Sequence, residues 1–281
     1  VERLAPVNRF AMSRVVQRHS VRHLNRSIEE RRLVRYLSGL KRRTVHTAHV
    51  PFLNFGGVKG AARPVYFATI RDPYKRLASH YEYEHFGPRP LYVRLFHQDT
   101  KMETFGECVQ GHMQGRGKIK GRFDCLQTAG LQVRFFCGLS DWCRRTSEHT
   151  LHVALENIKS NFATVVVVER MLLSFRVLEA SLPHLFKGLV KGYLAASSPS
   201  GADGMHSRAN GAAKATGGAV SHAQRRFVMR SPLLHLEYKL YNFSVARLVE
   251  QAARCGLPSA AAAAAAPNGT PNGTPNGTPN G

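Results

Sequence analysis

Two side chains suited to binding an anion flank a sharp turn near residue 70. Val65–Ile70 is a short apolar, β-prone run, Asp72 is a suitable N-cap, and Pro73 suits the first position of a helix. The pattern predicts a strand, a turn and a helix, with Arg71 at the carboxyl end of the strand and Ser79 two turns into the helix. Ligands bind at this edge of open α/β sheets, and an arginine fork with a hydroxyl suits a phosphate group. The alternative is that Arg71 pairs with Asp72 and Ser79 faces solvent.

His49 is a candidate general base. Imidazole titrates near neutral pH and can accept the proton of a hydroxyl group that attacks an electrophile. Taken alone, however, one of 14 histidines more often has a structural or surface role than a catalytic one.

The charge balance predicts a polyanionic partner. The 281 residues include 40 Lys and Arg against 18 Asp and Glu, a formal net charge of +22. Nucleic acid, an anionic membrane and an acidic polysaccharide would all fit this charge. No zinc-finger spacing or RNP-like aromatic run supports nucleic acid, and no apolar run reaches the roughly 18 residues that span a bilayer. At 43% hydrophobic residues, the chain is expected to fold over most of its length.

Four of the five cysteines are clustered. Cys108, Cys125, Cys137 and Cys143 lie within 36 residues and lack the paired C-x-x-C spacing of a zinc ribbon. We expect local disulfides formed in an oxidising compartment and no metal; reduced core cysteines are the alternative. Their pairing is not deducible, and Cys255 is expected to be the odd one.

Strands and helices alternate along the chain, which indicates an α/β fold. Residues 1–45 are Arg-rich and read as helical, and a loop-rich excursion with one short helix covers 86–125. The other expected elements are a helix at Tyr74–His85, a helix at Ser147–Ser160, a strand at Ala163–Val168, a helix at Met171–Leu182, a loop at 195–222 and an amphipathic helical segment at 223–254. We expect one domain over 1–254 and a low-complexity, disordered tail over 255–281.

Four motifs in order resemble the uronosyl 2-O-sulfotransferases, more the uronyl type than the heparan sulfate type. They are TAHVPFLNFGG, PVYFATIRDPYKRLASHYEYEHFG, RFFCGLSDWC and LPHLFKG, and the likeness extends from about His46 to Phe243. The resemblance implies a single sulfotransferase domain of the P-loop type, with a parallel sheet flanked by helices.

The resemblance also implies a reaction and a set of site residues. The reaction is transfer of a sulfuryl group from 3'-phosphoadenosine 5'-phosphosulfate to the 2-hydroxyl of a uronic acid in dermatan, chondroitin or heparan sulfate, without a metal. The implied residues are His49 as the base; Arg71, Ser79 and Tyr193 at the nucleotide; and Arg89, Arg94 and Arg208 at the acceptor.

The family's first strand, loop and helix, which hold the 5'-phosphosulfate, find no match in residues 1–45. The sequence therefore predicts an N-terminally incomplete domain. An inactive glycosaminoglycan-binding relic, or a truncated form of such an enzyme, is the alternative function. The resemblance further implies a type II membrane protein of the Golgi lumen, its anchor outside this chain, and a homotrimer. N-x-S/T sequons, including those at Asn25 and Asn242, would allow glycosylation there.

Overall fold

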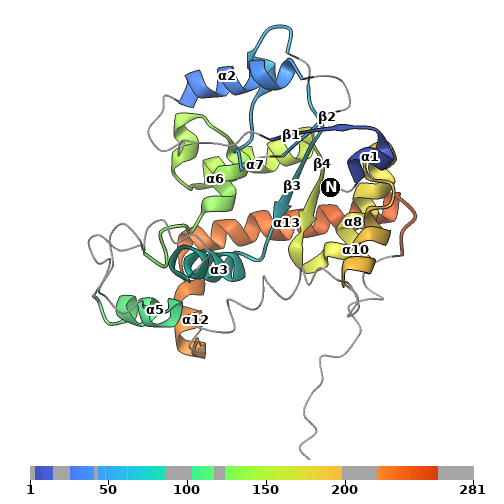
Figure 1. Cartoon of the computed structure of the whole chain (residues 1–281). Coiled ribbons are helices and arrows are strands. Elements are labelled where there is room, and N and C mark those ends of the chain that lie inside the picture. Colours follow the sequence, from blue (N-terminus) through green and yellow to red (C-terminus); the bar gives the residue numbers. More distant parts are fainter. Residues whose placement is uncertain are drawn as a thin grey trace, which may run out of the picture.

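The computed structural model describes residues 4–14, 26–40, 44–47, 49–61, 63–86, 103–116, 124–197 and 220–258 (Figure 1). Its helices are α1 (Ala5–Asn8), α2 (Arg26–Ser38), α3 (Pro73–Phe86), α5 (Phe105–Met113), α6 (Leu131–Cys137), α7 (Glu148–Asn161), α8 (Met171–Ser181), α9 (Pro183–Phe186), α10 (Leu189–Ser197), α12 (His222–Met229) and α13 (Pro232–Arg254). Its strands are β1 (Ala11–Arg14), β2 (Thr44–Thr47), β3 (Tyr66–Ile70) and β4 (Phe162–Val167). No helix in these ranges is long and apolar enough to cross a membrane.

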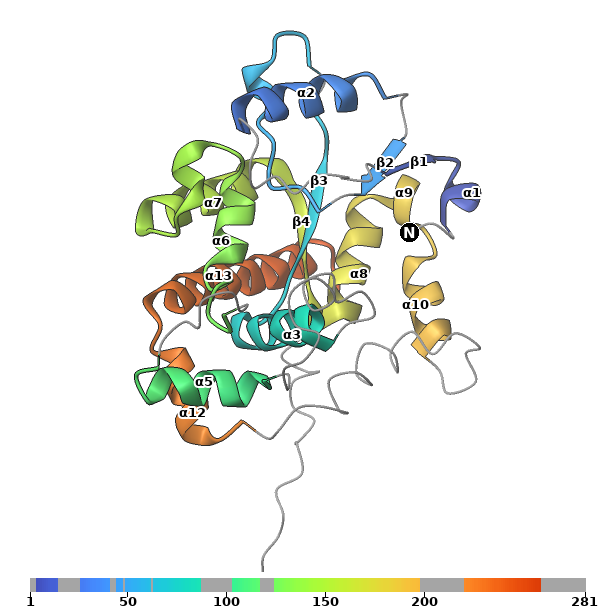
Figure 2. The same cartoon turned by 60° about the vertical axis from the view of Figure 1, so that its left-hand side comes forward.

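The pair β3–β4 lies at the centre of the fold. The strands are parallel, with Phe67 opposite Thr164 and Ile70 opposite Val167. Because side chains alternate along a strand, the two faces of the pair enter different hydrophobic clusters. Val165 and Val167 pack with α6, α7 and α13, whereas Val166 packs with α8 and α9. In Figures 1 and 2, α13 crosses beside β4 and α3 follows the end of β3.

The expected parallel sheet flanked by helices is found only in part. The described strands form two separate parallel pairs, β1–β2 and β3–β4. Both views place the β1–β2 pair away from α3, towards the amino-terminal ends of β3 and β4 (Figures 1 and 2). The mixed, parallel architecture fits a sulfotransferase, and the P-loop type remains a prediction.

The prediction that residues 1–45 are helical is wrong at β1 and at the start of β2. Ala11 pairs with Thr44 and Arg14 pairs with Thr47 in parallel register. This pairing joins segments more than 30 residues apart in the sequence, so a local helical pattern cannot reveal it. Only the central part of the region, α2, matches the expected helix.

The closing helical segment is divided into two helices. Ser221 caps α12 through a capping box with Gln224. The second helix, α13, starts afresh with Pro232 at its first position, because proline lacks the N–H that a continuing helix requires.

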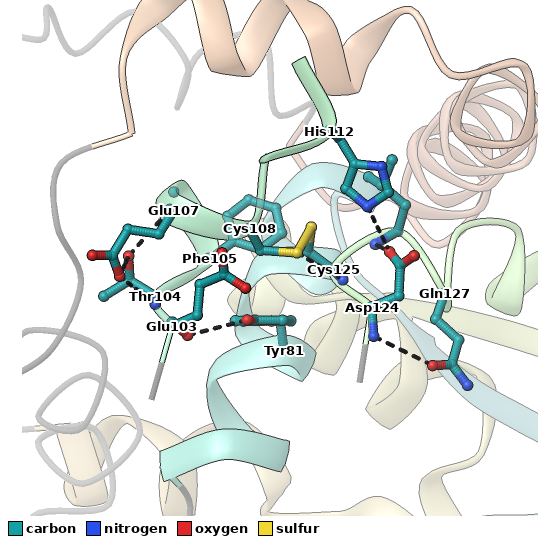
Figure 3. Close-up of a disulfide and its surroundings, with 12 residues drawn as sticks. Tyr81, Glu103, Thr104, Phe105, Glu107, Cys108, His112, Asp124, Cys125 and Gln127 are labelled. Atoms are coloured by element: carbon teal, nitrogen blue, oxygen red, sulfur yellow. Dashed lines mark hydrogen bonds and ion pairs between the residues drawn. A yellow bond between two sulfur atoms is a disulfide. The ribbon is translucent and has the colours of Figure 1, made fainter. Parts of the chain in front are cut away.

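Two disulfides confirm the expectation from the cysteine cluster. Cys108 bonds to Cys125, and Cys137 bonds to Cys143. Figure 3 shows the first of these beside α5. Cys255 is the free, exposed cysteine, as predicted.

Removal of the disulfides is expected to destabilise the protein. Replacing Cys108 and Cys125 with serine should lower the free energy of unfolding by about 3 kcal/mol, because the unfolded chain loses the closure of a loop with sequence separation 17. Replacing Cys137 and Cys143, at sequence separation 6, should lower the free energy of unfolding by about 2 kcal/mol. Urea denaturation of both double variants, with and without reductant, measures these losses. Equal melting temperatures for the oxidised and reduced wild type would contradict both.

Candidate active site

The turn between β3 and α3 has the geometry that its sequence predicts. The Asp72 carboxylate accepts the Lys75 backbone N–H at 2.9 Å, so Asp72 caps the helix that begins at Pro73. The other carboxylate oxygen of Asp72 accepts the hydroxyl of Tyr238 at 3.1 Å. Both oxygens of Asp72 are thus engaged by groups other than Arg71.

The alternative in which Arg71 pairs with Asp72 is wrong. Within the described ranges the Arg71 guanidinium makes no ion pair and no hydrogen bond, and its Nε is buried without an acceptor. A buried guanidinium N–H without an acceptor costs free energy unless a ligand accepts from it. Arg71 therefore has donor capacity for an anion at the carboxyl end of β3.

The backbone of Arg71 is held by a side-chain amide. Gln132, at the start of α6, accepts the Arg71 N–H at 2.9 Å and donates to the Arg71 carbonyl at 3.0 Å. The main chain just after β3 is thereby tied to a second element that lies 61 residues away in sequence.

A buried ion pair lies behind this contact. The Arg76 guanidinium bonds to the Glu237 carboxylate at 3.0 Å, and the side chains are 13% and 0% exposed. Arg76 also donates to the hydroxyl and the carbonyl of Thr128, and the Gln132 N–H donates to Glu237 at 2.7 Å. Burial raises the pKa of Glu237, while Arg76 and the Gln132 N–H act in the opposite direction.

Sequence reasoning missed these partners. The signal that could have found Glu237 is a single carboxylate on the apolar face of a helix, between Leu236 and Leu240. Gln132 carries no comparable signal, because its role depends on pairing with a distant backbone.

A second carboxylate lies at the ends of the strands. Glu169, just after β4, accepts the Asp72 N–H at 3.1 Å and the hydroxyl of Tyr241 at 3.2 Å. Burial and the neighbouring Asp72 carboxylate raise the pKa of Tyr238 to about 12, so it stays a neutral donor. Two tyrosines of α13 thus hold the carboxylates at this edge.

Ser79 and Tyr193 lie on different elements. Ser79 is half-buried on α3, two turns after Asp72, and makes no hydrogen bond with a described residue. Tyr193 is half-buried on α10, where its ring packs edge-on against Phe175 at 5.1 Å. No described contact joins Tyr193 to Arg71 or Ser79.

His49 is exposed and follows β2. The segment after it is attached to α6, since the Phe52 N–H donates to the Phe135 carbonyl at 2.9 Å. The same helix holds Arg71 through Gln132, so α6 connects the two parts of the predicted site. The described residues contain no hydrogen bond between His49 and Arg71 or Ser79. Arg89, Arg94 and Arg208 lie outside the described residues.

One group of potential metal ligands occurs among the described residues. Ligand atoms of Cys108, His112, Asp124 and Cys125 lie within 4.8 Å of one another. The two sulfurs are bonded to each other, and His112 Nε2 lies 3.1 Å from Asp124 Oδ1 (Figure 3). In this state the sulfurs cannot act as thiolate ligands, and the group is a disulfide with an adjoining His–Asp pair.

Comparison with known proteins shows that the chain is homologous to 2-O-sulfotransferases, which confirms the family resemblance of its motifs. Heparan sulfate 2-O-sulfotransferase 1 is 36% identical in Xenopus laevis and 34% identical in Homo sapiens, each over 149 residues, or 52% of this chain and 39% of the relative. Uronyl 2-sulfotransferase of Homo sapiens is 28% identical over 172 residues, 59% of this chain and 40% of the relative. No family model matches the chain.

The chain therefore aligns with about two fifths of the length of these relatives. Identity is higher with the heparan sulfate enzymes and the aligned length is greater with the uronyl enzyme, so the expected likeness to the uronyl type stays a prediction.

Proposed function

We propose that the protein is a glycosaminoglycan uronosyl 2-O-sulfotransferase that uses 3'-phosphoadenosine 5'-phosphosulfate as its sulfuryl donor. The proposal rests on the homology to 2-O-sulfotransferases. The observation that carries the site is the buried Arg71 Nε without an acceptor, at the strand edge where α/β folds bind ligands.

Each proposed residue has a chemical task. Arg71 and Ser79 donate hydrogen bonds to the 3'-phosphate of the donor, and Tyr193 lies near the nucleotide. His49 accepts the proton of the uronate 2-hydroxyl as that oxygen bonds to sulfur and the sulfur–oxygen bond to the 5'-phosphate breaks. The products are a 2-O-sulfated uronate and 3'-phosphoadenosine 5'-phosphate.

The proposed acceptor is an anionic polysaccharide, in accord with the net charge of +22. Arg89, Arg94 and Arg208 are proposed to bind its sulfate and carboxylate groups. Two disulfides favour an oxidising compartment, and we propose the Golgi lumen.

Sulfate transfer from labelled donor to desulfated heparan, dermatan and chondroitin chains tests the proposal. Disaccharide analysis should find 2-O-sulfated uronate and so identify the acceptor. Retention on heparin without any transfer would contradict the enzymatic function and support the non-catalytic, polysaccharide-binding alternative.

Arg71→Met is expected to reduce recognition of the 3'-phosphate. Calorimetric titration with 3'-phosphoadenosine 5'-phosphate and with AMP, which lacks the 3'-phosphate, gives a ratio of affinities for each variant. This ratio should fall about 10- to 100-fold in Arg71→Met, since hydrogen bonds to a charged group contribute about 1.5–3 kcal/mol. The exposed Arg145 provides the control, and Arg145→Met should keep the wild-type ratio. A wild-type ratio near one would contradict the nucleotide site.

A further inference from the structure

We propose that Gln132 is a positioning residue for the nucleotide site, which fixes the main chain of Arg71 so that its guanidinium faces the 3'-phosphate. This inference rests on the proposed function, and it adds a residue that the sequence motifs did not assign to the site. Gln132 itself is held by the buried pair of Arg76 and Glu237.

The first step is the contact between Gln132 and Arg71. The side-chain amide accepts from the Arg71 N–H at 2.9 Å and donates to the Arg71 carbonyl at 3.0 Å. Two hydrogen bonds to one residue fix both the position and the rotation of its backbone. The Arg71 guanidinium has no described partner of its own, so the anchored backbone is the described constraint on where this side chain starts.

The second step is the rigidity of Gln132. Gln132 is 8% exposed, and its backbone N–H donates to the fully buried Glu237 carboxylate at 2.7 Å. Glu237 also binds Arg76, which belongs to the helix that follows Arg71. The contacts therefore form a closed ring, from Arg71 to Gln132, Glu237 and Arg76 and back along the chain.

The third step is the chemistry of the amide. A side chain must offer both an acceptor and a donor to satisfy the N–H and the carbonyl of Arg71 together. Leucine, of similar size, offers neither. Ionised glutamate keeps the acceptor and loses the donor. Gln132→Leu therefore removes both hydrogen bonds to the Arg71 backbone. Gln132→Glu removes only the bond to the Arg71 carbonyl.

The experiment compares affinity ratios within single proteins. For wild type, Gln132→Leu and Gln132→Glu, titration measures the affinity for 3'-phosphoadenosine 5'-phosphate relative to AMP. We expect the ratio to fall about tenfold in Gln132→Leu and by less in Gln132→Glu, with the affinity for AMP nearly unchanged. If Gln132→Leu does not fold, Gln132→Glu, which loses only the donor, tests the role through its smaller expected fall in the ratio.

Asn157→Leu is the matched control. The Asn157 amide donates to the carbonyls of Phe136 and Cys137 at 2.9 and 3.1 Å, at the opposite end of α6. Its loss should destabilise the fold to a similar degree and leave the ratio unchanged. The double variant Arg71→Met/Gln132→Leu should show the same ratio as Arg71→Met, because Gln132 acts through Arg71.

The outcomes distinguish the two proposals. If the wild-type protein binds 3'-phosphoadenosine 5'-phosphate and AMP with nearly equal affinity, the proposed nucleotide site fails. The positioning role of Gln132 then fails with it. If Arg71→Met lowers the ratio and Gln132→Leu does not, the nucleotide site stands and the positioning role of Gln132 is overturned. An equal fall of the ratio in Asn157→Leu would also overturn it, because the effect would then be general destabilisation.

Discussion

Replacing His49 with alanine is expected to lower the rate of sulfate transfer by about 10² to 10⁴-fold, the usual contribution of a general base. In the proposed reaction the uronate hydroxyl loses its proton as its oxygen attacks sulfur, and alanine cannot accept that proton. His49 is exposed and makes no hydrogen bond within the described residues, so its removal should leave the fold intact. The salt concentration that elutes the protein from heparin should stay unchanged. Transfer of labelled sulfate and elution from heparin measure the two effects separately.

His184 provides the control for this variant. It is exposed on α9, so His184→Ala should retain wild-type transfer and heparin retention. Transfer by His49→Ala within tenfold of wild type would show that His49 is not the base. Loss of heparin retention in His49→Ala would instead assign His49 to acceptor binding.

Glu237→Leu is expected to lower the free energy of unfolding by about 3–5 kcal/mol, the cost of removing one partner of a buried ion pair. The Arg76 side chain, 13% exposed, would keep its charge without a carboxylate. The Gln132 N–H would lose its acceptor at 2.7 Å as well. Urea denaturation monitored by circular dichroism measures the change.

Two further variants test the reason for this loss. Arg76→Met/Glu237→Leu should be more stable than Glu237→Leu alone, because an apolar pair leaves no uncompensated charge. Glu148→Gln removes an exposed ion pair with Lys239, in which the side chains are 69% and 46% exposed, and should cost less than about 1 kcal/mol. A loss below about 1 kcal/mol in Glu237→Leu, or no recovery in the double variant, would contradict a buried charge pair.

The predicted site residues differ in how well the described structure agrees with their proposed roles. Arg71 has the strongest support, because its position, its unused guanidinium and its anchored backbone agree with anion binding. Arg71 is attached to α6 through Gln132, and the segment after His49 is attached to it through Phe52, but the described part of the chain shows no hydrogen bond between His49 and Arg71. Tyr193 packs against Phe175 on a separate helix, and its nucleotide role stays a prediction.

Local features of the chain could be predicted because their causes are local. The β3–α3 unit follows from an apolar run, a capping aspartate and a proline within nine residues, and it was found within a residue or two of its expected bounds. The helices α7 and α8 and the strand β4 were likewise found from their hydrophobic periodicity. The presence of disulfides and the odd Cys255 followed from cysteine spacing alone.

Only the tertiary structure decided which distant groups meet. The β1–β2 pairing, the partners of each disulfide, and the contacts of Gln132 with Arg71 and Glu237 join segments remote in sequence. Residue types and spacing along one segment determine whether it can form a helix, a strand or an anion-binding turn. Which backbone N–H, carbonyl or carboxylate then completes a buried hydrogen bond depends on packing between elements, and a single sequence does not encode that in any local pattern.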